Sequence, residues 1–382
     1  MTREERSGPL GAAASVCPVC GARYDAATRF CGRDGAALQP ADLLVGRTID
    51  RFRVVRPLAT GGMGHVYLAE EIGTGRPCAL KVLDREVARD PEMRKRFERE
   101  ATNHARLGAH PHVCALYSFG TTADDIAYIA MEYVDGEPLS ALLRRAGALP
   151  PERAARIVWQ AAQGLAAAHA VGLVHRDLKP ENIMLGRTLN GRDSVTLIDF
   201  GIAKMPFDQR QRLTGTGVAV GTPRFMSPEQ LSADVVDARS DVYSLALLAF
   251  LMLTGVLPFP ATSPASLAMR ATGALLTLHA ARPDVGWPAA LQATLDRALV
   301  PDPRQRTASV SDFARDLVQA IGAWQHAAAR ADARERVVPP TSALPEHLAS
   351  APYELPTPPE AVRAITPPAA PPWRGPDEPS RS

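Results

Sequence analysis

Lysine is scarce in this sequence of 382 residues: 4 residues are Lys, whereas 39 are Arg. The preference for Arg, together with abundant Ala and Pro, is typical of a GC-rich genome. It also means that each of the few lysines invites a specific explanation. The formal net charge at pH 7 is only +2, so charge gives no reason to expect nucleic acid or a membrane surface as the main partner.

A long apolar run is missing as well. The N-terminus, MTREERSGPL, lacks the apolar stretch of a secretory signal peptide. The most apolar segment, LALLAFLMLTGVLPF from Leu245, is interrupted by Thr254, Gly255 and Pro258, and it is too short to span a bilayer. We therefore expect a buried helix here, and a cytoplasmic protein without a membrane segment.

Cysteines are few and unevenly placed. Three of the five lie between residues 17 and 31, and the odd number argues against a disulfide scaffold. Cys78 and Cys114 lie in apolar segments, where free cysteines are ordinarily core residues.

Composition divides the chain into regions. Residues 1–16 are small and charged, which predicts a flexible N-terminus, and residues 17–40 hold the cysteine cluster. Residues 51–325 alternate apolar segments with short turns, as a globular domain does. Residues 335–382 are rich in proline: 13 of the last 52 residues are Pro, which predicts a disordered, extended tail.

The order of elements in the globular region indicates its fold class. Asp90-Pro91 resembles an N-cap followed by proline at the first helical position, and Gly108 follows the pattern's end, which predicts a helix over 91–107. Asn190-Gly191 between two apolar runs predicts a hairpin with a type I′ turn. We further expect strands over 52–57, 65–70, 77–83, 114–120 and 126–132, and helices including 151–169 and 241–254. A strand-rich first third and a helical remainder predict an α+β domain with two lobes and a cleft between them.

A glycine-rich stretch, LATGGMGHVY at 58–67, lies between two of the expected strands. Glycine lets a backbone turn tightly or lie close against a ligand, but an ordinary glycine-rich hairpin is the alternative. Lys81 in CALKVL lies mid-strand between apolar neighbours. Burying its charge unpaired costs several kcal/mol, so we expect Glu100 in the following helix as its partner; the alternative is a solvated surface lysine.

Three further motifs follow in order: HRDLKPENIM at 175–184, LIDFG at 197–201 and GTPRFMSPE at 221–229. With them, residues from about 51 to 324 resemble a protein kinase catalytic domain of the Ser/Thr type found in bacteria. The resemblance implies the bilobal kinase fold, with a β-rich N-lobe and a helical C-lobe. It also implies transfer of the γ-phosphate of ATP to Ser or Thr hydroxyls of protein substrates, in bacterial signal transduction.

The resemblance assigns catalytic roles. Phosphoryl transfer needs positioning and neutralisation of phosphate charge more than covalent chemistry. Asp177 would orient the substrate hydroxyl and accept its proton, and Lys179 would meet the γ-phosphate. Lys81, held by Glu100, would bind the α- and β-phosphates; lysine suits these two positions because they need a point charge and not a planar fork. The residues expected to hold Mg²⁺ are Asn182 and Asp199.

The resemblance also assigns the nucleotide pocket. The residues expected to line it are Leu58, Gly61, Gly62, Gly64, Val66, Lys81, Met131, Glu132 and Val134. Met131 would guard the adenine, and the three residues after it would form the hinge. The family has glycine where this chain has Ala59. Alanine fits there if φ stays negative, so we expect a modest effect on nucleotide affinity.

Other matches to the family are structural. Thr222 would hydrogen-bond near the catalytic aspartate and lysine, and Asp241 would brace the catalytic loop. Glu229 would pair with Arg306. His175 is expected to pack and to hydrogen-bond, and not to act as a base.

Regulation is suggested by Arg176, which precedes the catalytic aspartate. In kinases with this arginine, a phosphate on the activation segment is commonly drawn into a basic pocket, which orders the loop. Thr214 and Thr216 in LTGTGVAVGT are the expected autophosphorylation sites, and a homodimer would allow transfer in trans. The alternative is that they are unmodified loop threonines.

The cysteine cluster reads Cys17-x-x-Cys20, then Cys31 followed three residues later by Asp34. It resembles a small zinc ribbon with aspartate where the fourth cysteine usually stands. Zn²⁺ accepts a carboxylate oxygen, and a module this small would be unfolded without metal. We therefore expect a zinc site; the alternatives are a degenerate ribbon held by packing, or a ribbon with water as a ligand.

Two other functions are alternatives to a protein kinase. A pseudokinase adaptor would work through its two ends; the intact catalytic set argues against it, and only Ala59 favours it. A small-molecule phosphotransferase would not be expected to carry GTPRFMSPE at 221–229. For the tail, a linker, a site for polyproline-recognising partners and phosphorylation at Thr357 or Thr366 all stay open.

Overall fold

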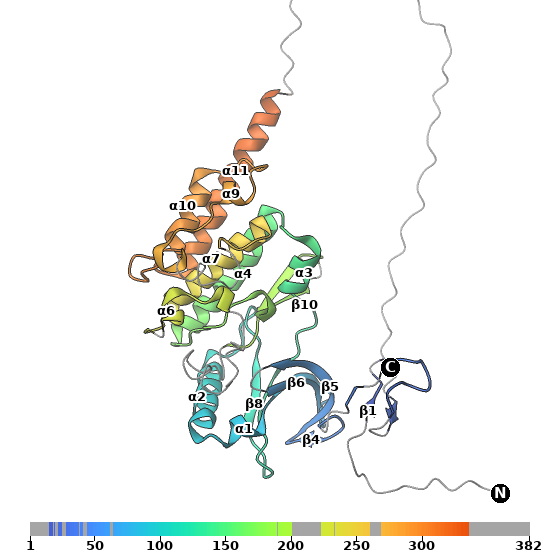
Figure 1. Ribbon diagram of the computed structural model, residues 1–382. Helices are drawn as coiled ribbons and strands as arrows, with labels where there is room; N and C mark the ends of the chain where they lie inside the picture. Colours follow the sequence, from blue (N-terminus) through green and yellow to red (C-terminus); the bar gives the residue numbers. More distant parts are fainter. Residues whose placement is uncertain are drawn as a thin grey trace, which may run out of the picture. The chain divides into compact units, whose positions relative to one another are not determined.

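The computed structural model describes residues 15–17, 19, 22–24, 28–37, 39–40, 44–61, 64–188, 190–200, 223–232, 234–259 and 269–335. The chain divides into two units, residues 1–329 and 330–382, and every element below lies in the first unit apart from the end of α11. The strands are β1 (Ser15–Val16), β2 (Arg23–Tyr24), β3 (Gln39–Pro40), β4 (Thr48–Ile49), β5 (Phe52–Gly61), β6 (Gly64–Glu71), β7 (Pro77–Leu83), β8 (Leu116–Thr121), β9 (Ala127–Glu132), β10 (Glu137–Pro138), β11 (Ile183–Arg187) and β12 (Asp193–Leu197). The helices are α1 (Arg85–Arg89), α2 (Pro91–Leu107), α3 (Leu139–Ala146), α4 (Pro151–Ala170), α6 (Pro228–Leu231), α7 (Ala238–Thr254), α9 (Leu278–Ala281), α10 (Ala289–Ala298) and α11 (Val310–Glu335) (Figure 1).

The N-lobe is built on an antiparallel sheet with the strand order β4-β5-β6-β7-β9-β8. Successive side chains of a strand point to opposite faces. In β7, Cys78, Leu80 and Val82 pack into an apolar cluster on one face. Ala79 packs against the main core on the other face, and the alternation places Lys81 on that same side. The strand register thus directs this lysine away from the N-lobe's own cluster.

Helix α2 begins and ends where the sequence predicts. The Asp90 side chain accepts hydrogen bonds from the backbone N–H groups of Glu92 and Met93, and Pro91 occupies the first turn. Gly108 ends the helix with φ 68°, a left-handed conformation that glycine adopts without a Cβ penalty. These local signals position the helix that carries Glu100.

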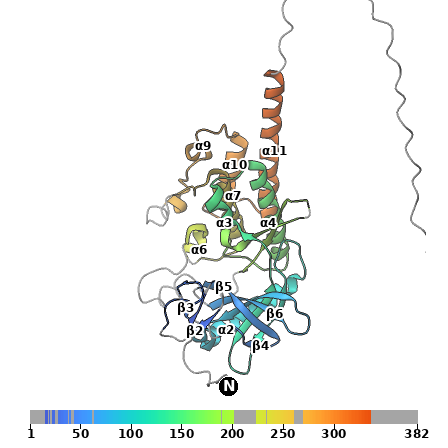
Figure 2. The same cartoon turned by 90° about the vertical axis from the view of Figure 1, so that its right-hand side faces the viewer.

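The C-lobe is helical, and both views show α3, α4 and α7 gathered together (Figures 1 and 2). The expected buried helix is confirmed as α7, which begins at Ala238, three residues before the prediction, because Asp237 caps the N–H of Arg239 at 2.8 Å. Helix α4 lies close to the backbone of His112, since a Cβ on Gly164 would be only 2.7 Å from the His112 carbonyl oxygen.

Helix α11 continues to Glu335, ten residues beyond the predicted domain end. No helix among those described is both long and apolar enough to cross a membrane.

The hairpin around residue 190 is present, but its turn differs from the prediction. Strands β11 and β12 pair with Arg187 opposite Asp193, so residues 188–192 connect them. The N–H of Gly191 donates to the carbonyl of Thr188 at 2.8 Å, which makes Gly191 the last residue of the turn. A two-residue type I′ turn on Asn190-Gly191 is therefore wrong. The N–H of Thr188 also donates to the Arg192 carbonyl at 2.9 Å. Backbone pairing thus continues one residue past each strand, and this pairing, not the dipeptide, sets the loop length.

Candidate functional site

The loop between α4 and β11 carries the catalytic candidates, and a buried carboxylate fixes it. Asp241 of α7 accepts the backbone N–H groups of His175 at 2.8 Å and Arg176 at 3.0 Å. The Nε2 atom of His169, on α4, also lies 2.7 Å from the Oδ2 atom of Asp241. Arg176 adopts φ 62°, a left-handed conformation that is uncommon outside glycine. The carboxylate thus holds a backbone turn that the sequence alone would disfavour; the contribution of His169 was not predicted.

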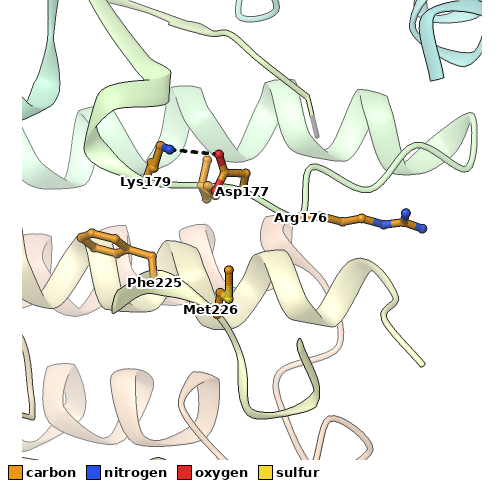
Figure 3. A pocket seen from close by; sticks show the side chains of 6 residues that line it. Arg176, Asp177, Lys179, Phe225 and Met226 are labelled. Carbon is orange, nitrogen blue, oxygen red and sulfur yellow. Dashed lines mark ion pairs between the residues drawn. The ribbon is translucent and has the colours of Figure 1, made fainter. Parts of the chain in front are cut away.

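Asp177, Lys179 and Asn182 converge. The Asp177 Oδ2 lies 3.1 Å from the Lys179 Nζ and accepts a hydrogen bond from the Asn182 Nδ2 at 3.0 Å. The same Nδ2 donates to the Asp177 carbonyl at 2.8 Å. In Figure 3, Asp177 and Lys179 lie side by side on one side of a small pocket, and Phe225 and Met226 lie on the opposite side. The Arg176 side chain points away. A carboxylate with one ammonium beside it and an apolar wall opposite can receive a hydroxyl group.

Lys81 and Asp199 form an ion pair, although 118 residues separate them in sequence. The N–H of Ile198 donates to the Asn182 carbonyl at 3.0 Å, which places Asp199 near the catalytic loop. Burial alone would raise the pKa of the Asp199 carboxyl, but the Lys81 ammonium holds it below its usual value. Asp199 is therefore ionised at neutral pH. The Glu100 side chain lies outside the described residues, so its pairing with Lys81 stays a prediction.

Three rings connect α2 to these segments. The His104 and Phe200 ring centroids lie 5.4 Å apart, and those of Phe200 and His175 lie 4.6 Å apart. The His104 Nε2 contacts the Cys114 carbonyl oxygen at 2.9 Å, and burial lowers its pKa, so the ring is neutral at physiological pH. Sequence reasoning found His175 as a packing residue but missed His104. Its only signal is a place on the buried side of α2, with Phe97 and Ala101.

The glycine-rich stretch forms the ends of β5 and β6, with Gly61 opposite Gly64. Gly64 has φ 152°, and a Cβ there would lie 2.0 Å from the Val82 carbonyl oxygen. Strand β7 alone therefore requires glycine at position 64, whether or not a ligand is bound. Ala59 is exposed, pairs with Val66 in the extended strand, and is not among the described residues with positive φ.

Replacing Gly64 by alanine should destabilise the N-lobe by about 1–3 kcal/mol, because the added methyl group must displace the β7 backbone. The matched change Ala59→Gly, five residues earlier, should cost only about 0.5–1 kcal/mol through backbone entropy. Thermal unfolding of both variants measures the difference. Equal stability of the two variants would contradict the close approach of Gly64 to Val82.

The expected adenine pocket draws on β5, β6, β9 and the segment that follows β9. Met131 is buried, and Leu58, Val66 and Val134 are half-buried. Glu132 is fixed twice against Ala115: its N–H donates to the Ala115 carbonyl at 2.8 Å, and its carboxylate accepts the Ala115 N–H at 3.1 Å. The segment expected to be the hinge is thus held by backbone contacts before any ligand binds.

Glu229 and Arg306 form a bidentate ion pair in the C-lobe, at 2.8 and 3.0 Å. Their side chains are 5% and 0% exposed, and the Ser240 hydroxyl donates to Glu229 at 2.6 Å. The pair links Glu229 on α6 to Arg306, which precedes α11. It also anchors residues 223–227, because they lead directly into α6. The expected site residues that lie outside the described residues are Gly62, Thr214, Thr216, Thr222 and Cys20.

The N-terminal segment brings three candidate metal ligands together. The Cys17 and Cys31 sulfur atoms and an Asp34 carboxylate oxygen lie within 4.8 Å of one another. Two turns share one hydrogen-bond pattern. The N–H of Cys17 donates to the Ala22 carbonyl and that of Cys31 to the Ala36 carbonyl; in each turn the N–H two residues after the cysteine lies 3.4 Å from its sulfur. In the sequence, Asp34 follows Cys31 by three residues, as Cys20 follows Cys17.

Comparison with known proteins points to protein kinases. A family model described as "Protein kinase domain" matches residues 52–325. The chain is 40% identical over 275 residues to Serine/threonine-protein kinase pkn2 of Myxococcus xanthus, covering 72% of this chain and 33% of the relative. It is 40% identical over 273 residues to Serine/threonine-protein kinase PknB of Mycobacterium tuberculosis, covering 71% and 43%. Among solved structures it resembles the Mycobacterium tuberculosis PknI kinase domain, with 34% identity, a TM-score of 0.57, and coverage of 73% and 100%. The chain therefore spans less than half the length of these curated relatives.

Proposed function

Because the chain belongs to the protein kinase family, we propose that it transfers the γ-phosphate of ATP to serine and threonine hydroxyls of proteins. The observation that carries the proposal is the convergence of Asp177, Lys179 and Asn182 beside the Lys81–Asp199 pair. These groups provide a carboxylate for a hydroxyl and two ammonium groups for phosphate oxygens. A pseudokinase adaptor would not need all of them.

The roles follow from position and charge. Asp177 orients the acceptor hydroxyl and takes its proton as the oxygen attacks phosphorus. Lys179, 3.1 Å from that carboxylate, neutralises charge on the transferred phosphoryl group. Lys81 binds the phosphates that stay behind. Asn182 keeps the Asp177 carboxylate in place through its amide nitrogen.

Asp199 and Asn182 are the residues that would hold Mg²⁺. Both offer oxygen donors, which Mg²⁺ prefers, and the hydrogen bond between Ile198 and Asn182 brings their segments together. The low pKa of Asp199 keeps the carboxylate anionic. When bound, the ion would shield the charge of the phosphates.

Regulation and setting form part of the same proposal. Autophosphorylation at Thr214 or Thr216, by a second copy of the chain, would place a phosphate in the activation segment, and Arg176 beside the catalytic aspartate is exposed and able to meet it. We propose a cytoplasmic location because ATP is available there. Cys78 and Cys114 are free thiols, as a reducing compartment favours.

Mass spectrometry of the 199–229 segment after incubation with Mg-ATP tests this function. Phosphate on Thr214 or Thr216 in the wild type, and none in Asp177→Asn, is the expected result. A generic protein substrate should be phosphorylated by the wild type alone. If neither the segment nor the substrate gains phosphate, the adaptor function replaces the kinase function.

We also propose that the N-terminal module binds Zn²⁺ through Cys17, Cys20, Cys31 and Asp34. The repeated turn supports this, since it presents each cysteine sulfur to a backbone N–H, which stabilises a thiolate. The ligand atoms within 4.8 Å suit tetrahedral coordination. The Ala36 N–H donates to the Asp34 carboxylate at 3.0 Å, so this side chain is oriented in the same way as the sulfur atoms.

Chelation followed by iodoacetamide labelling tests the metal site within one protein. Cys17 and Cys31 should be protected until zinc is removed. Cys78 and Cys114 should stay unlabelled throughout, because both are buried and burial raises the pKa of Cys78 to about 11.

Substitution of Asp34 separates metal binding from packing. Asp34→Ala should weaken zinc binding by about 10-fold or more, because one ligand is lost. Asp34→Cys should bind zinc at least as tightly as the wild type. Labelling that is independent of chelation, with no zinc found in the purified protein, would contradict the site.

A further inference from the structure

We propose that Arg270 is a positioning residue for the protein substrate: it holds the backbone of residues 224–226, here termed the acceptor wall, against the catalytic loop. The inference rests on the proposed kinase function, because it concerns where the acceptor protein binds. Nothing in the sequence motifs marks this arginine. It lies in a helical stretch at 269–272, more than 90 residues after Asp177.

Three consecutive carbonyl groups of the acceptor wall are each bound by a side chain. The Arg270 guanidinium donates to the Arg224 carbonyl at 3.0 Å and to the Met226 carbonyl at 3.2 Å. The Ser244 hydroxyl of α7 donates to the Phe225 carbonyl between them at 2.7 Å. Residues 223–225 form a short 3-10 helix, and buried carbonyl groups are paired as a rule. The partners of these three carbonyl groups are side chains far along the chain, so distant elements hold the segment in place.

The Arg270 side chain is itself immobilised. The residue is 2% exposed, and its guanidinium carbon lies 3.9 Å from the centroid of the Phe259 ring. A cation over an aromatic face is stabilised by the ring's quadrupole, more so when water is excluded. A buried charge used only for packing would be costly. Here that cost is offset by carbonyl dipoles and by the ring, which makes the guanidinium a rigid anchor.

The other end of the acceptor wall is tied to the catalytic loop. The Gln230 side chain donates to the Arg176 carbonyl at 2.7 Å and accepts the Ser227 N–H at 3.0 Å. Phe225 and Met226 thus face Asp177 and Lys179 across the pocket at a fixed separation (Figure 3). An acceptor hydroxyl reaches Asp177 only if the protein that carries it fits against this wall.

This arrangement separates the two substrates. Arg270 touches residues on the protein-substrate side of Asp177, whereas the expected nucleotide residues lie on β5, β6, β7 and β9. Loss of Arg270 should therefore impair use of the acceptor protein and leave ATP binding intact. A purely structural role in the C-lobe would impair both.

The test uses the full chain with Arg270→Gln, Arg270→Lys and the control Arg153→Gln, which removes a C-lobe ion pair with Asp193. The acceptor probe is a synthetic peptide with the sequence of residues 207–220. We expect Arg270→Gln to lower kcat/KM for the peptide by about 10- to 100-fold, as a displaced binding wall does. KM for ATP and peptide-independent ATP hydrolysis should stay within about 2-fold. Arg270→Lys should recover part of the loss, and Arg153→Gln should show none.

Hydrogen exchange over residues 223–231 provides a readout that does not depend on activity. Exchange should be faster in Arg270→Gln than in the wild type and unchanged in Arg153→Gln. Equal losses in ATP hydrolysis and peptide phosphorylation, or unchanged exchange in Arg270→Gln, would overturn the positioning role. A wild type that transfers no phosphate would refute the proposed kinase function instead, and the exchange experiment would then decide whether Arg270 holds the wall.

Discussion

Asp199→Asn should reduce phosphate transfer by about 10³-fold or more, because it removes the anionic oxygen expected to hold Mg²⁺, a contribution of several kcal/mol. The change is well suited to isolate charge. Asp199 has φ 60°, and asparagine tolerates this left-handed conformation as well as aspartate does. The variant should therefore fold normally while Lys81 loses its ion-pair partner. Initial rates of peptide phosphorylation at saturating and limiting Mg²⁺, together with thermal unfolding, measure both properties.

Asp193→Asn is the matched control for that experiment. Asp193 lies six residues earlier on β12 and makes a bidentate ion pair with Arg153 at 2.7 and 2.9 Å. Its loss should change stability and leave the rate per folded molecule within about 2-fold. A comparable loss of rate in both variants would show that the hairpin tolerates no carboxylate change. Activity of Asp199→Asn near the wild-type level would remove this residue from the proposed mechanism.

Local signals predicted local structure well. Asp90-Pro91 and Gly108 fixed both ends of α2, because a cap and a left-handed glycine act within one turn of the helix. The type I′ turn at Asn190-Gly191 was wrong for the complementary reason. The pairing of β11 with β12 over residues 183–197 determines where the strands separate, and that pairing depends on both strands and not on the dipeptide.

The site residues were predicted from family resemblance, and not from periodicity. Lys81 and Asp199 come from different lobes, and no local pattern joins residues 118 positions apart. His104, Gln230 and Arg270 escaped prediction because their roles consist of contacts with distant backbone or rings. In the sequence, each is an ordinary polar residue in a helical segment. Only the folded chain reveals which carbonyl groups they serve.

Removing one partner of the buried Glu229–Arg306 pair should destabilise the C-lobe strongly. Arg306→Met should lower the free energy of unfolding by about 3–5 kcal/mol, because it leaves a buried carboxylate without its partner. Arg306 also donates to the carbonyl groups of Arg239, Val300 and Pro301, so the loss extends beyond one ion pair. Denaturant unfolding of the full chain at pH 7 measures the effect. The exposed pair Arg282–Asp284 supplies the control Arg282→Met, which should cost less than about 1 kcal/mol.

The pH dependence of this variant identifies the cause. Burial raises the pKa of Glu229, but Arg306 and Ser240 together hold it below its ordinary value of 4.5. A carboxyl group with a lowered pKa stabilises the folded state above the ordinary value and loses that contribution as the pH falls through the folded pKa. In Arg306→Met only the Ser240 hydroxyl still opposes the effect of burial, so we expect Glu229 to take up a proton more readily in the folded than in the unfolded chain. The stability difference between wild type and Arg306→Met should therefore begin to shrink above pH 4.5, as the variant's Glu229 takes up its proton, and should shrink further below pH 4.5, as the wild type loses its contribution. Adding Glu229→Gln to Arg306→Met should recover part of the loss at pH 7 and remove this pH dependence. A difference that is constant with pH, and not reduced in the double variant, would mean that Arg306 acts through its carbonyl contacts and not through the charge of Glu229.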